Sequence, residues 1–409
     1  MTIRLADYLL ARDTAVASQV ASKYTDVAGD PHMRTRLERL TALMLEYFLP
    51  ELRGADLGPI VDNVFRNQEC AAYEASVELG EDYPDLLDQL IQVEPAGRLA
   101  SSLGKRALYC AFHLDSYRLL IAYLRIQCER PVGLLVTPDV IAAQRDQINA
   151  IGASALPGAP ERTDVRLFDA ESFEGLGDAL RFLGKGGLLV IYIDGNSGFG
   201  GMAARHKSMA RIPFLGGQIM ARLGVAQLAS RLAMPIVPLY VENLDNGCRR
   251  LHCLPELAPP AQGSRAAQIE TTRQLYAILE QRIRRQPASW EGWLYVNRFV
   301  EQLPPAAGQG GADGAHTGPS IAPQQRAPWA AGEPLVFAHR AYTLLPYPGA
   351  TVLMCKRRLS YQLVSKAAVA VLERAFHGPV DAAALAAPQA IAELVRLGAL
   401  VPRSSAMAT

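Results

Sequence analysis

The feature that most constrains the fold of this chain is a regular alternation of short apolar runs with helical patterns through residues 105–302. Five apolar runs have the length of buried strands: residues 107–112, 132–137, 165–168, 188–193 and 236–241. The helical patterns between them begin near Ser116, Pro138, Ser172 and Gly216. This order is typical of an α/β sheet with helices on both sides. In such sheets, binding sites form where strands end and loops converge.

Three further regions flank this core. Residues 1–104 carry apolar residues at helical spacing, which predicts a helical layer that covers the sheet or recognises an acceptor. Residues 303–334 are rich in Gly, Pro, Ala and Gln, a composition typical of a flexible linker between domains. The pattern of apolar residues in 335–409 predicts a small domain. Its strands are expected at 343–345 and 351–355, and its helices at 366–376 and 389–397. This order resembles a winged-helix module and, more loosely, the small peptide-binding chaperone domains of peptide-modifying pathways.

Composition and charge argue against several classes of protein. The formal net charge is +1, so the chain has no overall field that would attract nucleic acid or an anionic membrane. No segment reaches the roughly 18–20 consecutive apolar residues of a membrane-spanning helix. The first residues also lack the apolar centre of a signal peptide. We therefore expect a cytoplasmic protein. Cys248 and Cys253 enclose His252, but no further ligands follow at zinc spacing, so we expect no metal site.

The most specific pattern in the chain lies between residues 193 and 242. It begins IDGNSGFGGMAARHKSMARIPFLGG, which reads as a strand end at Asp194, a Gly-rich loop, a basic stretch and a Pro-Phe-Leu-Gly-Gly turn. A helix and a second buried strand follow. The glycine spacing does not fit phosphate-loop or dinucleotide-binding motifs. Upstream, His113 follows the run Tyr-Cys-Ala-Phe at a similar junction between a strand and a helix.

These residues resemble the soluble core of the glycerolipid and lipid A acyltransferase family. Residues 286–299, with a Pro, two Trp and then Arg-Phe, are similar to the closing motif of that family. The resemblance implies a mixed sheet flanked by helices and no bound cofactor. It also implies an acyl thioester donor, either acyl-coenzyme A or a phosphopantetheinyl carrier protein. Lipid A acyltransferases usually carry an N-terminal membrane anchor, and its predicted absence here favours specialised metabolite biosynthesis over bulk lipid synthesis.

In this family a His at the strand-to-helix junction removes the proton from the acceptor, so the resemblance assigns His113 as general base. The family places an Asp or Glu after four intervening residues, and that carboxylate orients the imidazole. Here that position is Arg118, which we also take as a candidate for substrate binding. Asp115 is the nearest substitute in sequence, although its other interpretation is the N-cap of the next helix. Asp194, at the end of a neighbouring strand, is a second candidate.

Several residues are candidates for substrate binding. In the family the Asp-then-Gly segment lies beside the active site, which here includes Asn196. The basic stretch that follows contains Lys207, and Arg211 comes directly before the Pro-Phe-Leu-Gly turn; both suit phosphate groups of the donor. In lipid A acyltransferases a very similar turn leads into a helix that lines the acyl channel. By resemblance, Phe214 and a helix at 216–232 wall that channel. Gly216 and Gly217 at the start of that helix leave room for the thioester chain or bind an anion through their N–H groups.

Two classes of function follow from these patterns. The first is a soluble acyltransferase that acylates an amine or hydroxyl of a small molecule or peptide. The second is a non-catalytic protein that keeps the fold and binds an acyl or peptidyl group, which Arg118 at the acid position favours. Aminoacyl transfer from a carrier or from aminoacyl-tRNA is a further variant, although the near-neutral charge lacks the basic footprint of tRNA binding. A carboxylate bonded to His113 would favour the enzyme.

Overall fold

The computed structural model describes most of the chain, in two compact units. The described residues are 4–22, 33–76, 83–142, 165–196, 208–300, 333–339, 341–347, 350–355, 360–382, 385 and 387–406. The first unit comprises Met1–Met33, Gly54–Phe214 and Met220–Leu294, and the second comprises Arg34–Arg53, Leu215–Ile219 and Tyr295–Thr409. The predicted linker lies outside the described residues except for Glu333 and Pro334.

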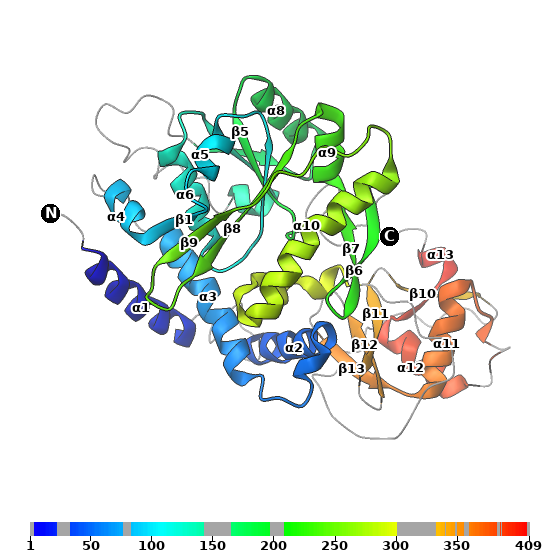
Figure 1. The fold of residues 1–409 in the computed structure, drawn as a ribbon. Helices are drawn as coiled ribbons and strands as arrows, with labels where there is room; N and C mark the ends of the chain where they lie inside the picture. Colours follow the sequence, from blue (N-terminus) through cyan, green and yellow to red (C-terminus); the bar gives the residue numbers. More distant parts are fainter. Residues whose placement is uncertain are drawn as a thin grey trace. The chain divides into compact units, whose positions relative to one another are not determined.

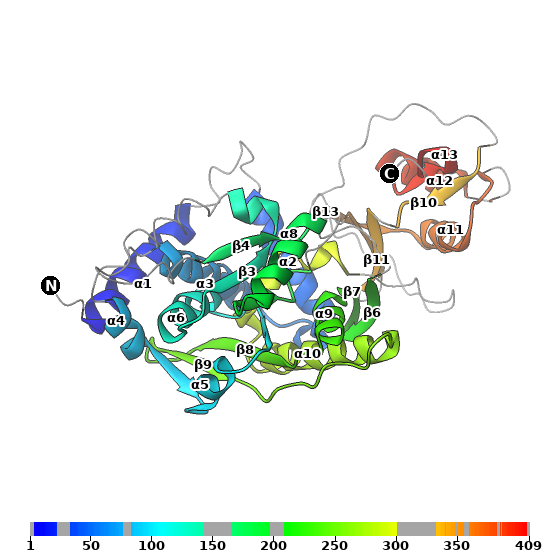
Figure 2. The same cartoon turned by 90° about the horizontal axis from the view of Figure 1, so that it is seen from above.

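The first unit is built on a mixed, 7-stranded sheet in the order β1-β9-β8-β2-β5-β3-β4 (Figures 1 and 2). All five predicted strands are present: β2 Leu108–Ala111, β3 Val132–Val136, β4 Arg166–Asp169, β5 Leu188–Tyr192 and β8 Ile236–Asn243. These five are parallel to one another, whereas β9 (Arg249–Cys253) pairs antiparallel with β8. β1 (Ile91–Glu94) pairs parallel with β9. β1 lies in the N-terminal region that was predicted as wholly helical. The sheet is therefore mixed, as predicted.

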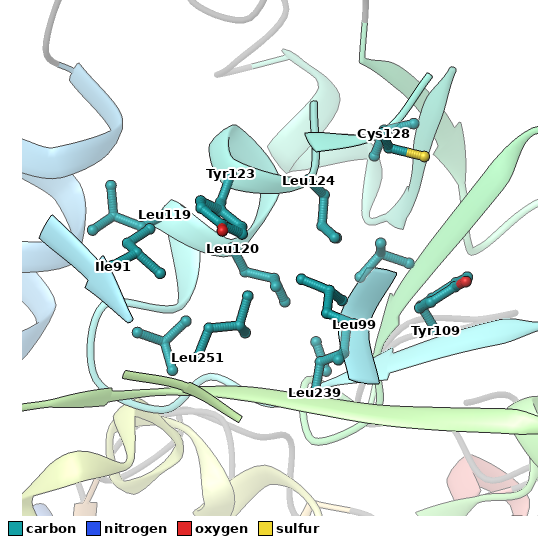
Figure 3. Close-up of a cluster of buried hydrophobic side chains, with 14 of the residues drawn as sticks. Ile91, Leu99, Tyr109, Leu119, Leu120, Tyr123, Leu124, Cys128, Leu239 and Leu251 are labelled. Atoms are coloured by element: carbon teal, nitrogen blue, oxygen red, sulfur yellow. The ribbon is translucent and has the colours of Figure 1, made fainter. Parts of the chain in front are cut away.

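Helices cover both faces of this sheet because successive residues of its central strands are apolar on both sides. Tyr109 and Val190 belong to a buried cluster that includes side chains of α6 (Tyr117–Gln127), as Figure 3 shows for part of it. Their chain neighbours Cys110 and Ile191 belong to a second cluster on the opposite face, with α8 (Phe173–Gly184), α9 (Gly224–Leu232) and α10 (Arg265–Arg285).

The remaining helices of this unit are α1 Leu5–Ser22, α3 Gly58–Ser76, α4 Tyr83–Leu90 and α5 Arg98–Leu103. α3 lies beside α6, and α9 lies beside α10. The serines before α8 and α10 accept hydrogen bonds from the third residue of each helix, which satisfies an otherwise unpaired amide. No helix in the described part of the chain is both long and apolar enough to cross a membrane.

The helix predicted over residues 216–232 is wrong in nearly its first half. β6 (Met209–Phe214) and β7 (Gly217–Arg222) form a two-stranded sheet, and the helix, α9, begins only at Gly224. In β7 the buried side chains are Ile219 and Ala221, two residues apart, which is the period of a strand. The apolar residues of this segment fit both periods, and the Pro-Phe-Leu-Gly turn that precedes it closes a hairpin instead of starting a helix.

The second unit contains the small C-terminal domain with its own hydrophobic core. It holds the antiparallel sheet β11-β12-β13, the pair β10-β14 and the helices α11 and α12. The bounds are β10 Leu335–Phe337, β11 Tyr342–Tyr347, β12 Ala350–Cys355, β13 Ser360–Val364, α11 Lys366–His377, α12 Pro388–Leu397, β14 Leu400–Pro402 and α13 Arg403–Ala406. Both predicted strands and both predicted helices are present here. α2 (Met33–Phe48), η2 (Pro50–Leu52) and η6 (Val296–Arg298) complete the unit.

Candidate active site

His113 and Asp194 meet at the carboxyl edge of the sheet because β2 and β5 are neighbouring parallel strands. Ala111 is paired with Tyr192 at the last register position of the two strands. His113 and Asp194 each follow two residues later, so both lie just beyond the strand ends. Carboxyl ends of parallel strands are the usual place for a site in an α/β sheet.

Asp194 accepts three hydrogen bonds and fixes the imidazole of His113. Its Oδ1 lies 2.9 Å from His113 Nδ1, and its Oδ2 accepts from the backbone N–H of His113 at 2.9 Å. The indole Nε1 of Trp290 donates to the same Oδ2 at 2.8 Å. The Asp194 side chain is fully buried, whereas 19% of the His113 side chain is exposed. A ligand can therefore reach the imidazole but not the carboxylate.

This arrangement determines the chemistry of the imidazole. With Asp194 bonded to Nδ1, the neutral ring carries its proton on Nδ1, and Nε2 is the nitrogen that can accept one. Burial lowers the pKa of His113, but the charge and hydrogen bond of Asp194 outweigh it, so the pKa lies above its ordinary value of 6.5. A His with a carboxylate on Nδ1 and a raised pKa is equipped to act as a general base.

Two tyrosines enclose the imidazole. The ring centroids of Tyr117 and Tyr192 each lie 4.7 Å from that of His113. The Tyr192 hydroxyl donates to the backbone carbonyl of Tyr117 at 2.9 Å, which holds the start of α6 against the end of β5. These contacts restrict rotation of the His113 ring and so keep Nδ1 on Asp194.

Asn196 holds the turn that carries Asp194. Its Nδ2 donates to the carbonyl of Met220, and its Oδ1 accepts from the backbone N–H of Arg222, so the side chain joins the turn to β7. Asn196 is buried and has a φ of 49°, a left-handed conformation that Asn adopts more readily than most residues. The sequence predicted Asn196 as a substrate contact; in the structure its side-chain oxygen and nitrogen are occupied by β7.

We expect Asn196→Ala to destabilise the protein by about 2 kcal/mol, because it leaves buried backbone groups of β7 unpaired and puts Ala in a left-handed conformation. Asn196→Gly relieves the conformation but not the lost hydrogen bonds, so it separates the two causes. Urea unfolding measures both variants. A free energy of unfolding equal to that of the wild type in both would contradict the assigned role.

Asp115, the nearest carboxylate in sequence, does not pair with His113. Its Oδ2 accepts from Arg282 at 3.1 Å and from the backbone N–H of Asn243 at 3.3 Å. Nor does it cap the following helix, whose N-cap is Ser116. The backbone of Asp115 has a φ of 50°, so the chain turns sharply there and the side chain meets α10 instead of the imidazole. Burial raises the pKa of Asp115 to about 6 although Arg282 lowers it.

Arg118, at the position where the acyltransferases that the sequence resembles have an acid, contacts Tyr117, whose ring contacts the imidazole. Its Nε donates to the hydroxyl of Tyr117 at 3.0 Å, and that hydroxyl lies 3.5 Å from Oε1 of Glu291. The backbone N–H of Glu291 donates to the carbonyl of His113 at 3.0 Å. A cation and an anion therefore both contact the Tyr117 hydroxyl, and the ring of Tyr117 contacts the candidate base.

The remaining predicted residues are not part of this cluster. Phe214 is fully buried against Tyr276 and Trp290, with ring centroids 5.7 and 5.3 Å away, so it belongs to the core. Arg211 is exposed on β6. Lys207 lies outside the described residues.

Gly216 and Gly217 belong to the second unit and allow close packing against the end of α2. The backbone N–H of Gly216 donates to the carbonyl of Phe48 at 2.7 Å. A Cβ on Gly217 would lie 2.5 Å from the ring of Tyr47. The space that these glycines leave is therefore filled by protein side chains, and the prediction that it holds the thioester chain is wrong.

Sequence reasoning missed Trp290 and Glu291 as members of the site. Trp290 was expected only to pack on the core, on one helix face with Trp293. It lies between the short helices η4 (Pro287–Ser289) and η5 (Glu291–Leu294), and its indole N–H reaches Asp194. The closing motif at 286–299 was the available signal, because it brings two Trp and an acid back to the core.

No family model matches this sequence, and no curated protein is similar to it. The comparison with acyltransferases therefore depends on the motifs and the geometry described above.

Proposed function

We propose that this protein is an acyltransferase that moves an acyl group from a thioester to an amine or hydroxyl. The observation that carries the proposal is the His113–Asp194 pair, held by three hydrogen bonds at the carboxyl edge of the sheet. The sequence motifs and the mixed sheet flanked by helices support a likeness to glycerolipid and lipid A acyltransferases. The carboxylate comes from the neighbouring strand end instead of from the α6 position.

In the proposed reaction the acceptor attacks the thioester carbonyl while His113 Nε2 takes its proton. A bond forms between the acceptor atom and the carbonyl carbon, and the carbon–sulfur bond breaks when the tetrahedral intermediate collapses. The thiolate leaves and takes the proton back from the imidazolium. Asp194 stabilises the imidazolium that forms between the two steps.

The non-catalytic alternative rests on Arg118 at the acid position. That alternative requires His113 to have no carboxylate partner. The hydrogen bond between His113 and Asp194 means that this condition is not met. The geometry therefore favours the enzyme. We propose that the C-terminal domain, whose order of elements resembles a winged-helix module, recruits the carrier or the acceptor.

Free-thiol release tests the proposal. The donors are acyl-coenzyme A and acyl-carrier thioesters from short to long chains, each offered with simple amines and alcohols. We expect release from some donors, reduced at least about 10³-fold by His113→Ala. The matched control is Glu174→Ala, at an exposed position of α8. Release from no donor, or release that His113→Ala leaves intact, would contradict the proposed function.

A further inference from the structure

A second charged cluster, separate from the His113–Asp194 pair, lies beside His113. It consists of Arg118, the Tyr117 hydroxyl and Glu291, with the hydroxyl between the two charges, 3.0 Å from Arg118 Nε and 3.5 Å from Glu291 Oε1. Tyr117 also contacts the imidazole through its ring. The cluster therefore adjoins the imidazole of His113.

Both charged groups of the cluster have hydrogen-bonding capacity that the described residues leave unused. Oε2 of Glu291 is buried and has no hydrogen-bond partner among the described residues. A buried carboxylate oxygen without a donor is unfavourable, so a ligand that supplies one is favoured there. Arg118 is partly buried, and in the described part of the chain its Nε makes the single hydrogen bond of its guanidinium. Its two terminal nitrogens can therefore bind a carboxylate.

The charge of the cluster is felt at the imidazole, which places both groups close to the reaction. Glu291 raises the pKa of His113, and Arg118 lowers it, although burial and Asp194 have larger effects. The backbone bond from Glu291 N–H to the carbonyl of His113 keeps the carboxylate at this place. A ligand that bridges Glu291 and Arg118 would therefore lie next to the candidate base.

We propose that the acceptor is a zwitterion of the α-amino acid class, with its ammonium on Glu291 and its carboxylate on Arg118. One hydroxyl separates the two protein charges, so a single small molecule can reach both. This inference rests on the proposed function and specifies the substrate of the same site. The amine loses one proton to bulk solvent as it binds productively and a second to His113 Nε2 as its nitrogen attacks. A carbon–nitrogen bond forms, the carbon–sulfur bond breaks, and the products are an N-acyl amino acid and a free thiol.

The experiment compares three probes on the full-length protein: L-alanine, alanine amide, which lacks the carboxylate, and N-acetylalanine, which lacks the amine. Isothermal titration measures binding, and thiol release in the presence of the best donor measures the acceptor KM. We expect each missing charge to weaken binding at least about tenfold. Glu291→Gln should remove the preference for the free amine, and Arg118→Gln the preference for the free carboxylate, with smaller effects on kcat than on KM.

Matched controls are Glu270→Gln and Arg273→Gln, an exposed pair on α10. Equal affinity for the three probes, a preference that survives both site variants, or no saturable binding of any probe would overturn the inference. If a site variant fails to fold, the affinities of the wild type for the three probes still test whether the site prefers a zwitterion. His113-dependent thiol release without a zwitterion preference overturns the inference alone. A zwitterion preference without thiol release overturns the proposed acyl transfer instead.

Discussion

Replacement of Asp194 by Asn is expected to lower kcat for thiol release by about 10⁴-fold while the fold is retained. The change is isosteric, and it alters charge and hydrogen-bonding polarity only. Its effect can be derived from the three contacts that Asp194 makes.

Two of those contacts fix the orientation of the new amide. The backbone N–H of His113 and the indole N–H of Trp290 both donate to Oδ2, so the carbonyl oxygen of Asn must occupy that position. The amide NH₂ group then faces Nδ1 of His113 in place of Oδ1. An NH₂ group donates to Nδ1, which moves the ring proton to Nε2. In this tautomer Nε2 cannot accept a proton from the acceptor, and general-base catalysis is lost.

The residual activity should also change its dependence on pH. In the wild type we expect activity to rise with pH through the His113 pKa, which lies above 6.5 because Asp194 outweighs burial. Without the carboxylate, burial dominates and the pKa falls, so the rising limb of the pH–rate profile moves to lower pH. Asp178→Asn, at an exposed position of α8, is the matched control and should leave both kcat and the profile unchanged. A loss of less than about tenfold in kcat would contradict the assigned role of Asp194.

The five parallel strands from β8 to β4 could be predicted from the sequence. The strands β1 and β9, at the other side of the sheet, could not, for a physical reason. β2 and β5 are buried on both faces and read as continuous apolar runs. β9, by contrast, contains two Arg and a His, and only alternate residues are buried. Its Arg249 is buried with Glu74 of α3, so a charged residue lies where the pattern of the sequence indicates solvent.

His113 and Asp194 could be predicted as site residues, but neither their pairing nor the part of Trp290 and Glu291 in the site could. His113 was a candidate through the resemblance to the acyltransferases, and Asp194 because it ends a neighbouring strand. Which carboxylate reaches the imidazole depends on the strand order, which places β5 next to β2 although β3 and β4 separate them in the chain. Proximity in sequence favoured Asp115, and the left-handed turn at that residue directs its side chain to Arg282 instead.

Gly292→Ala tests whether the segment after α10 supports both the core and the site. A Cβ at this position would lie 2.1 Å from Cε2 and Cζ2 of Trp290 and 2.6 Å from its Nε1. The indole cannot give way, because it is fully buried between Phe214 and Trp293, at ring centroid distances of 5.3 and 5.0 Å. We expect a loss of about 3 kcal/mol in the free energy of unfolding, measured by urea denaturation.

The same substitution should reduce catalysis in the molecules that remain folded. Any shift of the indole that relieves the overlap moves Nε1 away from Asp194 Oδ2, to which it donates at 2.8 Å. Asp194 then keeps two of its three donors, and its hold on the imidazole is weakened. Gly184→Ala, at the end of α8 with no atom within 4 Å of the added Cβ, is the matched control and should be neutral or slightly stabilising. Because the backbone of Gly292 is not left-handed, lack of space is the expected cause, and a variant as stable and active as Gly184→Ala would show that Trp290 does not support Asp194.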